Sequence, residues 1–423
     1  MKKYLKPYLF IVFAITVCLY FLHAQQPERC ATDLYTKLRD KKNPACAEER
    51  NRFDQAVEKI INEKKYKAIN NVVTIPVVVH LLYRINLENL PDSQIQSQID
   101  VMNEDFGRTN ADTALTPSVW RPIAANTGIQ FCLASRKPNG DPTNGIERRQ
   151  CINTTWEALS GVDSMKFDSL AGLNTWDASS YLNIWVCNLE GNYLGYTTIP
   201  TNVLDTFYDG VVVKSRAFGR NTFVAPPYDK GRTATHEIGH WLGLYHIWCG
   251  MCNGPCDLVN DTPPQLNSTS GCPVFPVFDQ CSPSYPGIMF MNYMDYTDDA
   301  CMNMYTMGQS VRMNVVLDSL RTSIHTSIGC SAPISVNEID GGKQISVYPN
   351  PAQSEIHFRC VGTISEKISL SICDVTGKEI LSMNNFSCTN SSSVNVSIFD
   401  AGVYFLRLTG KNFSSVSRFV LMR

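Results

Sequence analysis

The chain has 423 residues, enough for two or three domains, and 44% of them are hydrophobic, as in ordinary globular proteins. Its formal net charge is −2, so there is no basic surplus of the kind that indicates a nucleic-acid partner. Composition and charge therefore give no indication of a nucleic-acid-binding chain.

The first 24 residues have the pattern of a secretory signal peptide. Lys2, Lys3 and Lys6 precede an apolar run from Tyr8 to Leu22, and Ala24 is a small residue suited to cleavage. The run is shorter than the roughly 20 residues that a spanning helix needs. We therefore expect export, with no stable membrane span.

Residues 25–71 are rich in charge and are predicted to be helical over Ala45 to Lys67. They contain Cys30 and Cys46, and three lysines between 64 and 67 offer a cleavable junction. Composition favours two interpretations about equally. The segment is either a removable pro-segment or an N-terminal cap held by one disulfide.

Residues 72–328 are predicted as a catalytic domain that begins with a strand. The β-branched run from Val72 to Tyr83 predicts a buried strand, in which Pro76 places the first part at a sheet edge and His80 belongs to the core. A helix is predicted from Ser93 to Phe106, with Asp92 as its N-cap.

Further strands and a closing helix follow along the same domain. The predicted strands are Gly128 to Ala134, Tyr181 to Cys187, Leu194 to Ile199 and Gly210 to Ser215, and the closing helix is Thr306 to Ile324. Several strands before the central helix indicate an α/β (α+β) domain with a twisted sheet.

The stretch from His236 to His246 reads H-E-x-x-H-x-x-G-x-x-H, a metal-site pattern. On a helix, His236 and His240 lie on one face, and Glu237 can reach a metal-bound water. His246 would point away if the helix continued, so the helix must stop, and Gly243 can take the left-handed conformation. Three histidines leave one position open, as in a catalytic zinc site. Capped core histidines or a closed structural zinc site are the weaker alternatives.

Cysteines gather after this motif, in a stretch rich in Gly, Pro, Asn and Asp. They are Cys249, Cys252, Cys256, Cys272, Cys281 and Cys301. In an exported protein they indicate a loop held by disulfides rather than a second metal cluster. Earlier in the chain, Cys132 and Cys151 bracket a Pro/Gly/Asn-rich loop and are predicted to pair.

Residues 329–342 are predicted as a linker, and residues 343–423 change character to short alternating runs with turn signals. Val394 to Ile398, Val403 to Leu408 and Val416 to Met422 are predicted strands of a small all-β sandwich. No cluster of catalytic residue types occurs there, and His357 is predicted to be structural.

The zinc motif HEIGHWLGLYH resembles that of the metzincin metalloproteases, and NYMDYTDDAC about fifty residues later resembles the pappalysin family. With TIPVVVH and TMGQSVRM, the resemblance covers Val72 to Ser327. It implies a metzincin-type fold in which the three histidines bind zinc and Glu237 is the general base. It also implies that Met294 lies in the turn beneath the zinc and that Tyr296 stabilises the oxyanion.

The same resemblance implies a calcium loop with Asp257, Thr262 and the carbonyl of Asn260 as ligands; a capped turn is the alternative. It also implies disulfides between Cys272 and Cys301 and between Cys281 and either Cys252 or Cys256.

Arg29-Cys30-Ala31-Thr32 is similar to the pro-segment cysteine that occupies the zinc in latent relatives. Some relatives use an acidic residue just before the cysteine after the Met-turn to prefer basic substrates. This position is Ala300 here, and Asp298 and Asp299 are the candidates to replace it.

The tail, with YPNPA, DVTGK and GVYFL, resembles a type IX secretion sorting domain, with a carbohydrate- or protein-binding sandwich as the alternative. The resemblance implies the type IX machinery as a partner and a place outside a Gram-negative bacterium, released or on its surface. We therefore predict a secreted zinc endopeptidase that hydrolyses peptide bonds of proteins through metal-activated water. The alternative is a non-enzymatic surface adhesin that retains the fold.

Overall fold

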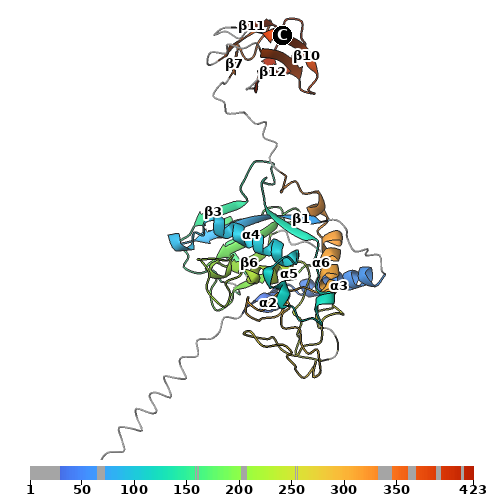
Figure 1. Ribbon diagram of the computed structural model, residues 1–423. Helices are drawn as coiled ribbons and strands as arrows, with labels where there is room; N and C mark the ends of the chain where they lie inside the picture. Colours follow the sequence, from blue (N-terminus) through green and yellow to red (C-terminus); the bar gives the residue numbers. More distant parts are fainter. Residues whose placement is uncertain are drawn as a thin grey trace, which may run out of the picture. The chain divides into compact units, whose positions relative to one another are not determined.

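The computed structural model describes residues 29–63, residues 72–331 apart from 158, 160, 161, 202–206, 253 and 255, and residues 345–423 apart from 361–367, 387–391 and 411–413. The predicted signal peptide and the lysines between 64 and 67 lie outside the described residues. The chain divides into two compact units between Pro333 and Ile334 (Figure 1), and each unit is considered by itself.

The first unit is built on a six-stranded sheet in the order β2-β1-β4-β6-β5, with β3 pairing β1 beyond the end of β2. All pairs are parallel except β5 with β6. The strands are β1 Val73–Tyr83, β2 Ile129–Leu133, β3 Ile146–Gln150, β4 Leu182–Cys187, β5 Gly195–Thr197 and β6 Val211–Lys214. The α/β sheet predicted from the order of elements is thus present.

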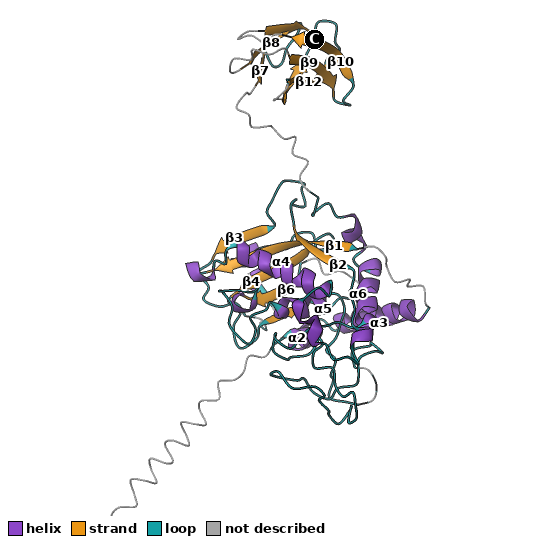
Figure 2. Ribbon diagram, viewed as in Figure 1, coloured by secondary structure: helices purple, strands orange, loops and turns teal. Residues whose placement is uncertain are grey.

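Two helices, α4 (Asp92–Phe106) and α5 (Arg232–Trp241), cover one face of this sheet, as Figure 2 shows. The apolar spacing of α4 buries Ile95, Ile99 and Met102 against alternate residues of β1, so that both layers share one core. A third helix, α6 (Met307–Ser319), begins at Thr306, which caps it through the Gln309 amide. Short 3-10 turns fill the connections: η1 Asn86–Glu88, η2 Ala111–Leu115, η3 Arg121–Ile123, η4 Ser164–Lys166, η5 Asp168–Leu170, η6 Ser215–Ala217 and η7 Thr322–Thr326.

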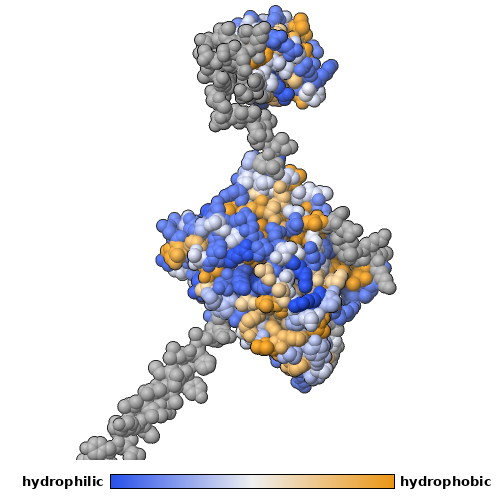
Figure 3. Space-filling model, in the orientation of Figure 1, coloured by the Kyte–Doolittle hydropathy of each residue, from blue (hydrophilic) through white to orange (hydrophobic). Residues whose placement is uncertain are grey.

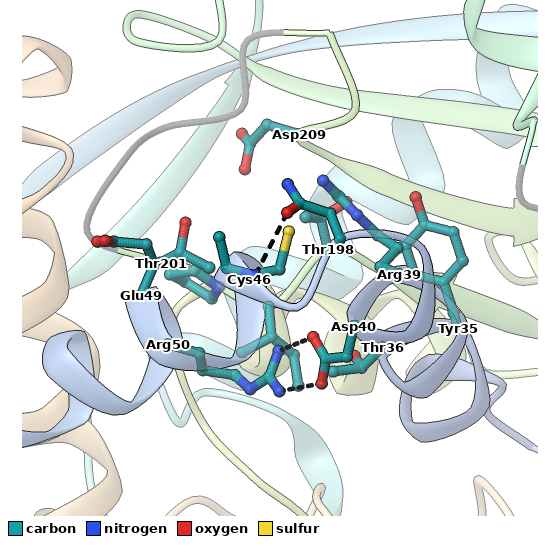
Figure 4. A pocket seen from close by; sticks show the side chains of 14 residues that line it. Tyr35, Thr36, Arg39, Asp40, Cys46, Glu49, Arg50, Thr198, Thr201 and Asp209 are labelled. Carbon is teal, nitrogen blue, oxygen red and sulfur yellow. Dashed lines mark hydrogen bonds and ion pairs between the residues drawn. The ribbon is translucent and has the colours of Figure 1, made fainter.

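The N-terminal segment forms two helices, α2 (Thr32–Lys42) and α3 (Ala45–Asn62), that pack on the first unit. Phe53 of α3 is buried against Val316 of α6. Figure 4 shows Asp40 of α2 ion-paired with Arg50 of α3, beside Thr198 and Thr201 of the loop that follows β5. Cys30 and Cys46 are both free thiols, so the alternative of a cap held by one disulfide is wrong.

The structure corrects one prediction for this unit, adds one strand and agrees with the predicted position of Pro76. The N-cap of α4 is Pro91; Asp92 is the first helical residue, and its carboxylate pairs with Arg148 instead of capping the helix. Strand β3 was not predicted, because its sequence IERRQ has one apolar residue and no alternation. Pro76 pairs with β2 alone, because β4 joins β1 only from Val77 onward, and this one-sided position fits an edge.

The predicted pairing of Cys132 with Cys151 is wrong. Cys132 of β2 is bonded to Cys330, 198 residues away, and Cys151 is a buried free thiol. The carbonyl of Gly329 also accepts a hydrogen bond from the backbone amide of Ser135. Residues 329–331 therefore belong to the first unit rather than to the predicted linker. A partner so distant in sequence could not be recognised from local composition.

The cysteine-rich stretch between α5 and α6 is a long loop closed by three disulfides. They join Cys249 to Cys256, Cys252 to Cys281, and Cys272 to Cys301. Within the described residues, no cysteine of this loop takes part in a metal-ligand cluster, so the rival interpretation has no support there.

The second unit is a sandwich of two antiparallel sheets, β10-β9-β12-β13 and β11-β8-β7. Its strands are β7 Ile345–Tyr348, β8 Glu355–Cys360, β9 Ile368–Asp374, β10 Glu379–Phe386, β11 Ser392–Asn395, β12 Gly402–Thr409 and β13 Ser414–Leu421. Alternate residues of β9 and β12, such as Leu370 and Leu406, are buried between the sheets.

No helix among the described residues has the length and apolar character that crossing a membrane requires. The face of the molecule drawn in Figure 3 mixes hydrophilic with apolar residues across the first unit.

Candidate active site

The central helix α5 ends where the sequence pattern requires it to end. Its last residue is Trp241, and Gly243 follows with a φ of +85°, a left-handed conformation that costs glycine little. The amide of Leu244 then bonds to the carbonyl of Gly239 at 3.0 Å. This turn brings His246 back toward the helix face that carries His236 and His240.

The three imidazoles converge on one point. The Nε2 atoms of His236 and His240 are 3.2 Å apart, those of His236 and His246 are 3.2 Å apart, and those of His240 and His246 are 3.0 Å apart. Three nitrogens bound to tetrahedral zinc at about 2.0–2.1 Å would be spaced at about 3.3 Å. The histidine cluster therefore fits a zinc ion with little movement.

Burial makes these histidines good ligands. All three are almost completely shielded from solvent. Burial lowers the pKa of His236, and it lowers the pKa of His240 to about 3, so both rings stay neutral and keep a free lone pair. Neutral imidazole is the form that binds zinc.

Glu237 lies on the same helix, fully buried beside the histidines. Its Oε2 accepts hydrogen bonds from the Thr32 hydroxyl at 2.9 Å and from the Cys30 thiol at 3.4 Å, while its Oε1 is buried and has no hydrogen-bond partner among the described residues. Burial raises the pKa of Glu237 to about 8, although the two donors act against this rise. A carboxyl group with a pKa close to neutrality suits a group that takes up and releases a proton.

Met294 and Tyr296 approach the site from the loop before α6. The Met294 sulfur lies directly against Gly239 of α5, only 2.5 Å from where a side chain at that glycine would begin. The ring of Tyr296 is 5.1 Å from the ring of His246, and its hydroxyl donates to the carbonyl of Cys30 at 3.1 Å. Met294 thus packs against α5 at Gly239, next to His240 in sequence, and Tyr296 lies against the ring of His246.

The N-terminal segment covers this site. Its Cys30 sulfur and the three histidine nitrogens all lie within 4.8 Å of one another. The Ala31 amide bonds to Gly195 of β5, which fixes the segment along the edge strand. Burial, together with the carboxylate of Glu237, raises the pKa of the Cys30 thiol well above its usual range, so a cation is needed there to hold a thiolate.

Arg29 lies in a buried polar recess next to Cys30. Its guanidinium donates to Asp299 at 2.7 Å and to the carbonyl of Thr297 at 2.9 Å. Asp299 is buried, Asp298 is half-buried and Ala300 is exposed. Of the two predicted replacements, Asp299 is therefore the carboxylate that faces a cation.

Asp257 and Thr262 also lie together, in the loop after α5. The Thr262 hydroxyl is 3.0 Å and 2.9 Å from the two carboxylate oxygens of Asp257 and 2.9 Å from the carbonyl of Val259. Burial raises the pKa of Asp257 to about 7. Asn260 is exposed beside them.

Sequence reasoning missed several residues that touch the site. Asp33 contacts His246 Nδ1 at 3.0 Å, Trp248 stacks on the same ring at 4.3 Å, and Thr32 contacts Glu237. In the sequence, Arg29 and Thr32 stand out only as neighbours of Cys30. Only their closeness to that cysteine in sequence could have drawn attention to them.

Comparisons with known proteins agree with this geometry. A family model described as pregnancy-associated plasma protein-A matches residues 167–318, and one described as a secretion system C-terminal sorting domain matches residues 346–422. An extracellular metalloprotease of Verticillium alfalfae is 34% identical over 261 residues, which cover 58% of this chain and 79% of that protein. The chain belongs to the pappalysin family of metalloproteases. Another extracellular metalloprotease, from Neurospora crassa, is 40% identical over 233 residues, 54% of this pappalysin and 78% of that protein.

Two solved structures from Tannerella forsythia resemble this pappalysin. Mature mirolysin in complex with a cleaved peptide is 48% identical, with a TM-score of 0.59 over 61% of this chain and 97% of that one. A promirolysin variant is 42% identical, with a TM-score of 0.65 over 71% of this chain and 97% of that one.

These findings identify a secreted or surface-exposed metalloendopeptidase of the metzincin type, made as a zymogen with a C-terminal sorting domain. The family and the histidine cluster together imply zinc as its metal. The alternative of a non-enzymatic adhesin is not favoured.

Proposed function

We propose that His236, His240 and His246 hold the catalytic zinc and that Glu237 is the general base. The observation that carries this assignment is the convergence of three Nε2 atoms, 3.0–3.2 Å apart, beside the buried carboxylate of Glu237. Zinc bound there would polarise the scissile carbonyl and bring the pKa of an attacking water close to neutrality.

The remaining chemistry belongs to this chain's own side chains. Glu237, buried beside the three imidazoles, would accept a proton from the attacking water and pass it to the leaving amine. Tyr296 already donates to a peptide carbonyl at the site, that of Cys30, and the same hydroxyl would stabilise the oxyanion of a substrate. Met294 packs against α5 and so supports the helix that carries two of the three histidines.

The direct test is hydrolysis of casein by the mature enzyme and its Glu237→Ala variant. We expect the variant to lose at least about 10³-fold in kcat/KM while it keeps one zinc per chain, and we expect a chelator to abolish the activity of the parent. A zinc-loaded Glu237→Ala variant with near-parental activity would contradict the role of Glu237.

We further propose that residues 25–71 are the pro-segment and that Cys30 is its latency switch. Three contacts support this. The Cys30 sulfur lies at the histidine cluster, the Thr32 hydroxyl donates to Glu237, and the Cys30 carbonyl accepts the hydrogen bond of the Tyr296 hydroxyl. Cys30→Ala should give an uncleaved chain with measurable activity. If that chain were as latent as the parent, the thiol would not be the switch.

We propose that the recess around Asp299 accepts a basic side chain next to the scissile bond. In the latent chain the Arg29 side chain occupies this recess, and Arg29 directly precedes Cys30, the residue that reaches the metal site. The recess therefore already accommodates a guanidinium group, with a carboxylate and a carbonyl in hydrogen-bonding positions.

We also propose that Asp257, Thr262 and the carbonyl of Asn260 bind calcium. The two carboxylate oxygens of Asp257 and the carbonyl of Val259 lie within 3.0 Å of the Thr262 hydroxyl, and clustered oxygens suit this hard cation. Millimolar calcium should raise the Tm of the parent and leave that of Asp257→Asn unchanged. Equal shifts for the two proteins would exclude the loop as the site.

Finally, we propose that the type IX secretion machinery is the partner of the second unit. The match of residues 346–422 to a secretion sorting domain supports this proposal. Protein or peptide substrates would then be met outside the cell.

A further inference from the structure

Each of the three histidines has a hydrogen-bond partner on its outer nitrogen, but the partners come from different parts of the chain. His236 Nδ1 is 2.7 Å from the carbonyl of Tyr293, and His240 Nδ1 is 2.8 Å from the carbonyl of Leu244. Both carbonyls belong to the catalytic unit itself. The partner of His246 Nδ1 is the carboxylate of Asp33, at 3.0 Å, on helix α2 of the N-terminal segment.

Such outer partners matter for a metal site. A hydrogen bond to Nδ1 fixes the tautomer, so that the lone pair of Nε2 faces the metal, and a carboxylate partner makes the ring a stronger ligand. His246 depends on this help more than the other two, because it follows the Gly243 turn instead of lying on α5. The rings of Trp248, stacked at 4.3 Å, and of Tyr296, at 5.1 Å, also contact His246.

The second helix of the N-terminal segment, α3, contacts the turn that precedes His246. Asp54 of α3 accepts the hydroxyl of Tyr245 at 2.7 Å, the residue just before His246. Asp54 also pairs with Arg312, which in turn donates to the carbonyl of Gly243 at 2.6 Å. The segment thus contacts the turn 243–246 from α2 and from α3.

We propose that Asp33 is a positioning residue for the metal site, supplied by the pro-segment. While the segment is attached, Asp33 supplies the hydrogen-bond partner of His246 Nδ1. The latent chain therefore retains zinc more firmly than it would with Cys30 as the segment's only contribution to the site. Cleavage removes both contributions, and the mature enzyme loses zinc to a chelator faster than the zymogen does. This inference rests on the proposed zinc site and pro-segment.

The effect of Asp33 can be separated from that of Cys30. The test uses the full chain with Glu237→Gln, which prevents self-cleavage and preserves hydrogen bonding to Thr32, together with Cys30→Ala. In this background, zinc transfer to a chromogenic chelator is timed for the parent, Asp33→Ala and Asp33→Asn. Asp40→Ala is the matched control, because it breaks the Asp40–Arg50 pair between α2 and α3 without touching a histidine (Figure 4).

We expect Asp33→Ala to lose zinc about 10-fold faster, at the low end of the usual outer-shell effect because the Asp33 side chain is 56% exposed. Asp33→Asn keeps an acceptor for Nδ1–H and should recover part of the loss. Asp40→Ala should leave the rate within about 2-fold of the parent, a margin small against the usual outer-shell effect. Equal rates for Asp33→Ala and the parent would overturn the proposal, as would an equal acceleration by Asp40→Ala.

A spectroscopic readout checks the contact itself. In the zinc-loaded parent, the Nδ1–H protons of the three histidines should appear as three protected, hydrogen-bonded NMR signals. Asp33→Ala should remove or shift only the signal of His246, because the other two protons bond to backbone carbonyls. Three unchanged signals would refute the role of Asp33. A parent chain that binds no zinc would instead refute the proposed metal site, so the two failures are distinguishable.

Discussion

Asp295, next to Met294, is a fully buried carboxyl group whose pKa burial raises to about 6. Its Oδ1 accepts the amides of Thr269 and Tyr296, and its Oδ2 accepts from Gln265 Nε2 at 2.9 Å. The pKa in the unfolded chain is close to 4, so between pH 4 and 6 the folded chain binds more protons than the unfolded one. The stability contributed by neutral Asp295 is therefore lost as the pH rises through about 6.

Asp295→Asn should remove this loss. An asparagine at position 295 keeps an oxygen that can accept the amides of Thr269 and Tyr296, and its side-chain amide does not titrate in this pH range. Between pH 4 and pH 7, the unfolding free energy of the variant should therefore rise by about 2–3 kcal/mol relative to that of the parent. A difference that stays constant over this range would show that Asp295 does not titrate in it.

Asp299 gives a prediction about substrate preference. Its Oδ1 binds Arg29 in the latent chain, while its Oδ2 is held by the amides of Lys230 and Arg232. In the mature enzyme, Asp299→Asn should lower kcat/KM about 10²-fold for peptides with Arg or Lys beside the scissile bond, and far less for alanine there. Asp298→Asn is the control, and a comparable loss in it would remove Asp299 from specificity.

At the scale of single residues, the sequence identified the cluster that the helix period dictates. His236, Glu237 and His240 are close in sequence, and an early helix stop was enough to bring in His246. The contacts of Arg29 and Asp33 join residues 270 and 213 positions apart, so no local pattern carries them. They follow from the docking of α2 on the site, which depends on the whole unit.

The element that decides the geometry of the site is the turn at Gly243. An alanine there would adopt a φ of +85° and place its Cβ 2.9 Å from the Val316 side chain. Gly243→Ala should cost about 1–2 kcal/mol for the left-handed backbone and more for the crowding. We expect displacement of His246, a lower Tm and less than one zinc per chain.

Gly250→Ala is the matched control for this prediction. Gly250 also has a positive φ, +75°, but no atom of the described residues lies within 4 Å of the new Cβ. The Gly250→Ala variant should lose only the stability that the left-handed backbone costs, and it should keep its zinc. Thermal unfolding and metal analysis would measure the two. If both variants retained zinc and lost equal stability, the turn would not be what places the third histidine.

Elements with a strong pattern were predictable, and elements fixed by tertiary contacts were not. Strand β1 and helix α4 follow from a β-branched run and a regular apolar spacing, and they begin and end within a residue or so of the prediction. Strand β3 is recruited by pairing with β1 and carries no signal of its own. The same holds for the bond from Cys132 to Cys330, which closes a loop that composition does not reveal.

At the scale of the whole molecule, the change in composition after residue 342 anticipated a second, all-β unit. Each unit has its own apolar core: the first centres on the sheet beneath α4 and α5, and the second on the inner faces of its two sheets. The disulfide at Cys330 fastens the end of the first unit to β2, so its last described residues do not depend on the second unit for their attachment.

Two separate cores lead to a prediction about the chain's route out of the cell. A chain that stops at Ser331 keeps the whole metal site, the Cys132–Cys330 bond and the first core. Once purified and activated, it should cleave casein with the kcat/KM of the full-length enzyme within about 2-fold, because no residue proposed to act in catalysis has been removed.

In the native host, the same truncated chain should accumulate in the periplasm, where fractionation and immunoblotting would find it, while the full chain reaches the medium or the cell surface. Deleting only Gly402 to Arg423 should have the same effect, because it removes β12, the partner of β9, and leaves the buried faces of Leu370 and Ile372 uncovered. Export of the truncated chain at the normal level would contradict the sorting role and favour a binding module. A truncated chain without activity would contradict the expectation that the first unit works without the second.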